Sequence, residues 1–205
     1  MSDEQERMSL RDAMLALHGA RREDDVVVTS MCAAREWMAL GTHPLDLVYV
    51  PSSMGQATSV GLGLALAQPH RRVIVVNGDG SMLMNLGSLV TITAAAPQNL
   101  ILIVADNGVY EVTGSQPTPG AAAGRADGKS VDFEAMARAC GFRSIFQFSN
   151  AAQWAQDLER VLRAMGPTFV LLDISSVPGI PGPRSPGPAG ARALELRRNL
   201  SPGTA

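Results

Sequence analysis

The sequence is poor in several residue types on which common protein functions depend. Of its 205 residues only 4% are aromatic, three are histidine and two are cysteine. Cys32 and Cys140 stand far apart and form no CxxC pair. We expect them to be reduced thiols in a cytosolic protein, with no role in binding a metal. Acidic and basic residues nearly balance at a net charge of -2, which gives no electrostatic argument for binding nucleic acid or an anionic membrane.

Long apolar runs are also missing. No stretch approaches the roughly 18 apolar residues that cross a bilayer, and the first residues, "MSDEQERMSLRD", are too charged for a secretory signal. The hydrophobic share of 46% is that of an ordinary globular domain. We therefore expect a soluble protein of the cytoplasm.

Short apolar runs alternate with helix-like segments. The runs are rich in β-branched residues, which is typical of parallel strands buried on both faces. We expect strands over 26–30, 47–50, 73–77, 100–105 and 168–174. Helices are expected over 6–19, 33–40, 55–68, 82–96, 131–140 and 150–165. This alternation predicts an α/β fold, a doubly wound and mostly parallel sheet in a single domain over 1–175.

Two segments lack an apolar period. Residues 114–130 are rich in Gly, Pro and Ala, and a loop of this length is usually mobile or functional. Residues 176–205 are rich in Pro and Gly. We expect them to form a C-terminal arm with a short helix near 190–199, which lies on a partner or is partly disordered.

A Gly-Asp-Gly-Ser turn, Gly78 to Ser81, follows the strand expected over 73–77. Ligands of open parallel sheets bind beyond the carboxyl ends of the strands, and the amides of Gly80 and Ser81 there favour phosphate. An acid beside phosphate is useful only if a cation such as Mg²⁺ lies between them. The alternative is that Asp79 merely caps the helix expected over 82–96.

A second oxygen-rich turn, Asp106-Asn107-Gly108, ends the strand expected over 100–105. Neighbouring strands lie about 5 Å apart, so both turns could reach one cation. Asn107 offers a neutral oxygen, and the turn at Gly108 directs the Val109 carbonyl to the same point. Because Asp-Asn-Gly is also a common turn sequence, the structural and the functional interpretation can hold together.

These paired turns resemble the signature of thiamine diphosphate-dependent 2-oxo acid decarboxylases, over roughly residues 22 to 175. The segments "SSMGQATSVGLGLAL", "GDGSMLMNLGSLVTI" and "DNGVYEVTGSQPT" are similar to the β-subunit of sulfopyruvate decarboxylase and to phosphonopyruvate decarboxylase. The resemblance covers the diphosphate-binding, C-terminal domain of that family. It implies thiamine diphosphate and Mg²⁺ as cofactors.

The resemblance also implies residue roles. Asp79, Asn107 and the Val109 carbonyl would ligate the metal, and Met54 would support the bent conformation of the cofactor. The full set of cofactor-binding residues would be Thr29, Ser30, Ser52, Met54, Gly78, Asp79, Gly80, Ser81, Asn107, Val109 and Tyr110. Two positions depart from the pattern. Asp106 replaces the first Asn of the usual doublet, and Gln56 stands where phosphonopyruvate decarboxylases often have His, which leaves the proton donor undefined.

One catalytic group is missing from the expected set. In the family a Glu on a separate pyrimidine-binding domain hydrogen-bonds the cofactor, whereas Glu4, Glu6 and Glu23 here lie in an N-terminal helix and its following turn. We expect a pyrimidine-binding α-type subunit to supply this Glu, in an α₂β₂ complex or a multiple of it. The expected activity is decarboxylation of a small 2-oxo acid. The alternatives are a subunit of an acetolactate-synthase-like carboligase and a non-catalytic cofactor-binding module.

Overall fold

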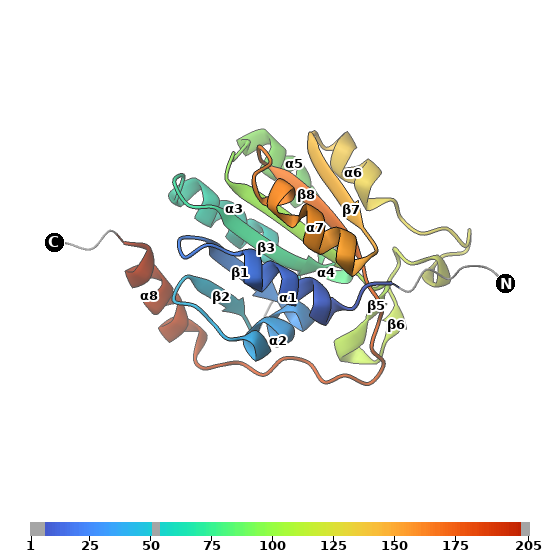
Figure 1. Ribbon diagram of the computed structural model, residues 1–205. Helices are drawn as coiled ribbons and strands as arrows, with labels where there is room; N and C mark the ends of the chain where they lie inside the picture. Colours follow the sequence, from blue (N-terminus) through green and yellow to red (C-terminus); the bar gives the residue numbers. More distant parts are fainter. Residues whose placement is uncertain (1–6, 51–53, 202–205) are drawn as a thin grey trace.

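The structure is a computed structural model that describes residues 7–50 and 54–201. It has one six-stranded parallel sheet in the order β2-β1-β3-β4-β8-β7, with helices on both faces (Figure 1). The strands of this sheet are β1 Val26–Ser30, β2 Asp46–Tyr49, β3 Val73–Gly78, β4 Leu100–Asp106, β7 Ser144–Phe148 and β8 Thr168–Asp173. The predicted doubly wound α/β class is confirmed.

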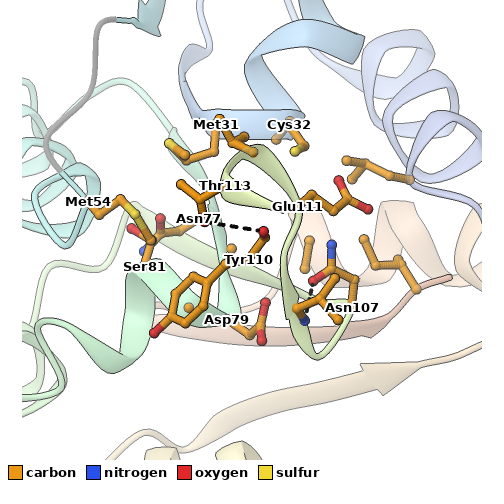
Figure 2. Close-up of a pocket in the computed structure, with 18 residues that line it drawn as sticks. Met31, Cys32, Met54, Asn77, Asp79, Ser81, Asn107, Tyr110, Glu111 and Thr113 are labelled. Carbon is orange, nitrogen blue, oxygen red and sulfur yellow. Dashed lines mark hydrogen bonds between the residues drawn. The ribbon is translucent and has the colours of Figure 1, made fainter. Parts of the chain in front are cut away.

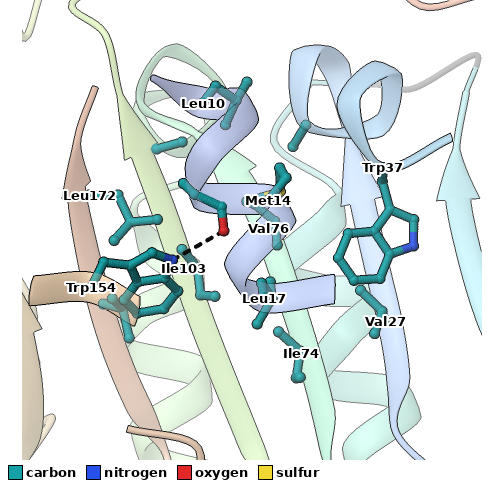
Figure 3. Packing of buried hydrophobic residues seen from close by; sticks show 14 of the residues in the cluster. Leu10, Met14, Leu17, Val27, Trp37, Ile74, Val76, Ile103, Trp154 and Leu172 are labelled. Carbon is teal, nitrogen blue, oxygen red and sulfur yellow. Dashed lines mark hydrogen bonds between the residues drawn. The ribbon is translucent and has the colours of Figure 1, made fainter. Parts of the chain in front are cut away.

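Alternating side chains of each strand enter two separate cores. Along β4, Ile101 and Ile103 face one core, and Leu102 and Val104 face the other. The first core lies under α1 Leu10–Ala20, α2 Met31–Leu40 and α7 Ala151–Leu162. Figure 3 shows this core, where the Trp154 indole N–H donates a 3.0 Å hydrogen bond to the Ala13 carbonyl. The second core lies under α3 Ala57–Ala67, α5 Gly87–Ala95, α6 Phe133–Ala139 and α8 Ala189–Leu200.

Three sequence predictions were wrong in detail. The strand β7 was not predicted, because "SIFQF" is a half-exposed edge strand and not an apolar run. The helix predicted over 82–96 is two helices, α4 Asp79–Leu83 and α5. The first helix begins only at Leu10, since Met8 pairs with Ile174 beside the sheet.

The long loop predicted over 114–130 contains short elements. It follows β5 Val109–Tyr110 and η1 Glu111–Thr113, and it holds β6 Gln116–Pro117 and η2 Ala122–Gly124. Strands β5 and β6 form a small antiparallel ribbon. The Thr118 amide donates to the Gly108 carbonyl at 2.9 Å, so the loop returns to the carboxyl end of β4.

The described part of the C-terminal arm packs on its own chain. It leaves β8, runs past β5 and β6, follows α2 and ends in α8 beside β2 (Figure 1). Leu196 and Leu200 of α8 are buried in the second core. The helix predicted near 190–199 is present, and the arm covers the free edge of β2.

Candidate functional site

The cavity of interest lies where the strand order reverses. The chain passes from β1 to β2 on one side and then to β3 on the other side, and this switch point is where open α/β sheets bind ligands. Figure 2 shows the cavity and its lining at the carboxyl ends of β3 and β4. The lining residues are Leu10, Met31, Cys32, Ala33, Met54, Asn77, Gly78, Asp79, Gly80, Ser81, Ala105, Asn107, Val109, Tyr110, Glu111, Val112, Thr113 and Ile174.

Asp79 is a buried carboxylate in the first turn of α4. It is 3% exposed, and its Oδ2 accepts a 3.0 Å hydrogen bond from the Thr118 hydroxyl. Burial, reinforced by the charge of Asp106, raises the pKa of Asp79 to about 7. The interpretation of Asp79 as the N-cap of a helix over 82–96 is wrong. Gly78 is the N-cap of α4, and a separate helix, α5, begins at Gly87.

Asp106 and Asn107 close the adjacent turn. Gly78 pairs with Ala105 across the two strands, so the residues that follow them are neighbours. Asp106 Oδ1 accepts from the Gly108 amide and Asn107 Oδ1 from the Val109 amide, both at 3.0 Å. Gly108 has a φ of 71°, which a residue with a side chain adopts at a cost. Burial also raises the pKa of Asp106.

The two acids fit a cation. Over 7–50 and 54–201 neither Asp79 nor Asp106 forms a salt bridge with a basic side chain, although both are mostly buried. The same part of the chain has no cluster of three His, Cys, Asp or Glu side chains suited to a metal. A metal here would therefore need mixed oxygen ligands. An amide oxygen has two lone pairs, so Asn107 keeps one for such a role.

Glycine permits a close contact directly after Asp79. A Cβ on Gly80 would lie 2.4 Å from Cε1 of Tyr110, so only Gly lets this ring pack against the turn. Ser81 Oγ accepts a 2.8 Å hydrogen bond from the Gly55 amide. This bond fixes the chain next to Met54, which lines the cavity near Ser81 (Figure 2).

Two of the predicted site residues, Thr29 and Ser30, are not among the residues that line the cavity. Ser52 lies outside the described residues. Thr29 and Ser30 are buried at the tip of β1, and Ser30 Oγ donates to Asn77 Oδ1 at 3.1 Å. The next residue, Met31, lines the cavity instead, with a φ of 52°. Gln56 is exposed at the start of α3 and is not a lining residue.

Three further lining residues were not predicted from the sequence to belong to the site. Asn77 precedes the glycine turn, and its Nδ2 is buried without a hydrogen-bond partner in the described chain, so it could donate to a ligand. Glu111 is 8% exposed and its Oε1 accepts a 2.8 Å hydrogen bond from the Val177 amide. Burial, followed by the nearby Glu111 carboxylate, raises the pKa of Cys32 to about 12. In the sequence, these lining residues are marked only by their positions close to residues of the recognised motifs.

These features fit a ligand that carries phosphate and a cation, bound at the switch point of a parallel sheet. Residues 25–173 match the family described as "Thiamine pyrophosphate enzyme, C-terminal TPP binding domain". The chain belongs to this family, which supports thiamine diphosphate as its cofactor. A structure of a thiamin diphosphate-dependent enzyme from Mycobacterium smegmatis shares the fold, with a TM-score of 0.66 over 82% of this chain and 32% of that chain, at 19% identity.

The curated relatives include enzymes that are named decarboxylases. The chain is 41% identical over 165 residues to a phosphonopyruvate decarboxylase of Streptomyces viridochromogenes, covering 80% of this chain and 39% of the relative. It is 43% identical over 150 residues to the sulfopyruvate decarboxylase subunit beta of Methanothermobacter thermautotrophicus, covering 72% of each. The chain thus spans well under half of the first relative and most of the second.

Proposed function

We propose that this chain is the β-type subunit of a thiamine diphosphate- and Mg²⁺-dependent decarboxylase of a small 2-oxo acid, similar to sulfopyruvate or phosphonopyruvate. The observation that carries the proposal is the convergence of Asp79 and Asn107 from neighbouring strand ends on one cavity. The family match and the names of the curated relatives support it. We place the protein in the cytoplasm. Within the described chain no helix is long and apolar enough to cross a membrane.

The residues divide into two groups by role. Asp79, Asn107 and the Val109 carbonyl would hold Mg²⁺, which neutralises both the diphosphate and the two buried acids. The amides of Gly80 and Ser81 and the side chain of Tyr110 would line the diphosphate. The remaining members of the proposed set are Thr29, Ser30, Ser52, Met54 and Gly78. When bound, thiamine diphosphate supplies the carbon nucleophile and then accepts the electron pair that departing CO₂ leaves.

We further propose that the catalytic site is completed by a pyrimidine-binding subunit. The cavity has a volume of about 60 Å³, whereas small-molecule sites usually enclose roughly 300–1,000 Å³. This chain therefore offers one wall of a site. Glu111 is the buried glutamate of the cavity, but it bonds the Val177 amide of the arm. The Glu that acts on the pyrimidine ring would come from the partner, in an α₂β₂ complex or a multiple.

Reconstitution tests the proposal. The purified chain, thiamine diphosphate, Mg²⁺ and a panel of 2-oxo acids should release almost no CO₂ until the partner subunit is added. Proton transfer by a positioned group contributes about 10²–10⁴-fold, so the residual rate of the chain alone should be lower by such a factor. Robust turnover by the chain alone would contradict the split site.

The product identifies the reaction among the alternatives. A free aldehyde supports decarboxylation, and an acyloin or acetolactate-like product supports a carboligase. Cofactor binding without turnover of any 2-oxo acid by the reconstituted pair would favour a non-catalytic binding module.

A further inference from the structure

The C-terminal arm begins at the cavity and contacts the loop that carries Tyr110. Where the arm leaves β8, the Ile174 amide donates a 3.0 Å hydrogen bond to the Asp106 carbonyl. Further along, the Val177 amide donates to Oε1 of Glu111 at 2.8 Å. Glu111 is the first residue of η1 and directly follows Tyr110 in the chain. The arm is therefore bonded to the cavity wall next to a residue that we place at the diphosphate.

Glu111 is a buried acid that no basic side chain neutralises. It is 8% exposed, and over residues 7–50 and 54–201 it forms no salt bridge. Its side chain also hydrogen-bonds Cys32 of α2, whose pKa is raised to about 12 by burial and then by Glu111. The thiol stays protonated and can donate to the carboxylate. Because a buried carboxylate is costly without donors, the bonds to Val177 and Cys32 hold this side chain in place.

The arm meets the same loop a second time at Gly182. A Cβ on Gly182 would lie 2.7 Å from Cγ1 of Val112, so the arm passes η1 at a distance that suits only glycine. Just before it, the Pro181 carbonyl accepts a 3.0 Å hydrogen bond from Arg35 of α2. The residues that follow Tyr110 are thus held both by α2 and by the arm.

The position of Tyr110 is sensitive to this loop. Its ring packs against the glycine turn, where a Cβ on Gly80 would lie only 2.4 Å from Cε1 of the ring. The Tyr110 carbonyl accepts a 3.0 Å hydrogen bond from the Ser115 amide, which closes the turn around η1. Because Tyr110 and Glu111 share a peptide bond, a shift of η1 moves the ring relative to Gly80.

We propose that Glu111 is a positioning residue, which ties η1 to the C-terminal arm and thereby sets Tyr110 against the glycine turn for binding the diphosphate. This inference rests on the proposed function and gives the arm a part in it. Glu111 acts through Tyr110 and not as a ligand itself, since a negative charge offered to a diphosphate would repel it.

A double-mutant cycle tests this role. Calorimetry measures the Kd of Mg²⁺–thiamine diphosphate and of Mg²⁺–inorganic diphosphate, with the full chain alone and with the reconstituted complex. Glu111→Ala should weaken both about tenfold, the size expected for one hydrogen bond to a charged acceptor. In a Tyr110→Ala background the same substitution should weaken binding by less than about twofold, because the residue through which Glu111 acts is gone. Equal losses in both backgrounds would show a merely structural role and overturn the inference.

The conservative variant separates the hydrogen bond from the charge. Glu111→Gln keeps an oxygen that accepts from the Val177 amide, so it should bind both ligands within about threefold of wild type. A Glu111→Gln chain that binds as weakly as Glu111→Ala would show that the charge matters and not the bond to the arm, which also overturns the inference.

A change on the arm itself keeps the test decisive if Glu111→Ala misfolds. Gly182→Ala places a Cβ against Val112 and should weaken both ligands roughly two- to fivefold. Gly190→Ala, on the same arm, is the matched control, because nothing lies within 4 Å of the added Cβ. It should change neither Kd. Wild-type affinity in Gly182→Ala would contradict the inference. Failure of the wild-type chain and complex to bind either ligand would contradict the proposed function itself.

Discussion

At the scale of single residues, Asp79 is a buried carboxylate whose charge costs the fold stability. A buried carboxylate without a cation is unfavourable, and its raised pKa of about 7 reports that burial and the neighbouring Asp106 disfavour its charge. Thr118 and the Gly80 amide offset part of this cost. A protein that needed Asp79 only to begin a helix would gain nothing from two adjacent buried acids.

The substitution Asp79→Asn should stabilise the cofactor-free chain and abolish its Mg²⁺-dependent cofactor binding. The pKa is about 7 in the folded chain and has a model value of 3.8. The ionised carboxylate therefore destabilises the fold increasingly as the pH rises from about 4, and fully above about 7. The gain in unfolding free energy should be roughly 1–3 kcal/mol at pH 8 and should vanish near pH 4.

Denaturant unfolding at both pH values measures the gain, and calorimetry measures cofactor binding. Asp127→Asn is a suitable control, because its carboxylate is exposed and Asp127 is not among the residues that line the cavity. An Asp79→Asn chain that is less stable than wild type at pH 8 would show that the carboxylate is needed for the fold.

At the scale of elements, the loop over 114–130 is joined to the cavity through Asp79. The bond from Thr118 to Asp79 and the 2.7 Å hydrogen bond from the Val131 amide to the Gly120 carbonyl hold its two ends. Between them, Arg125 and Lys129 are exposed. The middle of the loop has few buried contacts, so its order should depend on the site that anchors it.

Trypsin should cleave after Arg125 and Lys129 more slowly when Mg²⁺ and thiamine diphosphate are bound. Asp79 and Tyr110 would be held in place by the bound cofactor, and the hydrogen bond from Thr118 to Asp79 would then restrain the loop. We expect protection of at least several-fold, read from the fragment masses over time, and greater protection with the partner subunit. Cleavage after Arg143, which is exposed at the start of β7, is the control. Equal rates with and without ligands would show that the loop does not close over the site.

The elements also show which parts of the fold and of the site can be predicted from the sequence. Buried strands such as β3 and β4 are continuous apolar runs, and both were predicted near their observed bounds. The edge strand β7 was missed because its exposed side chains obey no single period. Asp79 and Asn107 could be predicted as one site because parallel strands end at the same edge. Glu111 and Met31 could not, since only tertiary packing turns them toward the cavity.

At the scale of the whole molecule, both ends of the sheet carry buried acids, and the ends differ in whether these acids are paired with basic side chains. At the amino end the buried acids are paired, Asp46 with Arg21 at 2.5 Å and Asp25 with Arg72. Asp46 also accepts from the Trp37 indole at 2.8 Å. At the carboxyl end, Asp79 and Asp106 form no such pair within the described residues. The acids at the amino end are therefore neutralised within the fold, and those at the carboxyl end are not paired by a basic side chain of the described residues.

Cofactor binding should consequently stabilise the whole domain. The site joins residues from β3, β4, η1 and the segment before α3, which pack on the two cores of a single sheet. A ligand that binds only the folded state adds about 2.7 kcal/mol at a hundred times its Kd. For a domain of this size that corresponds to a rise in Tm of about 5–10 °C. Differential scanning fluorimetry with Mg²⁺ and thiamine diphosphate together should show this rise, and either one alone should give less. EDTA should reverse it, and a shift that survives EDTA would show that the cofactor binds without a metal at Asp79.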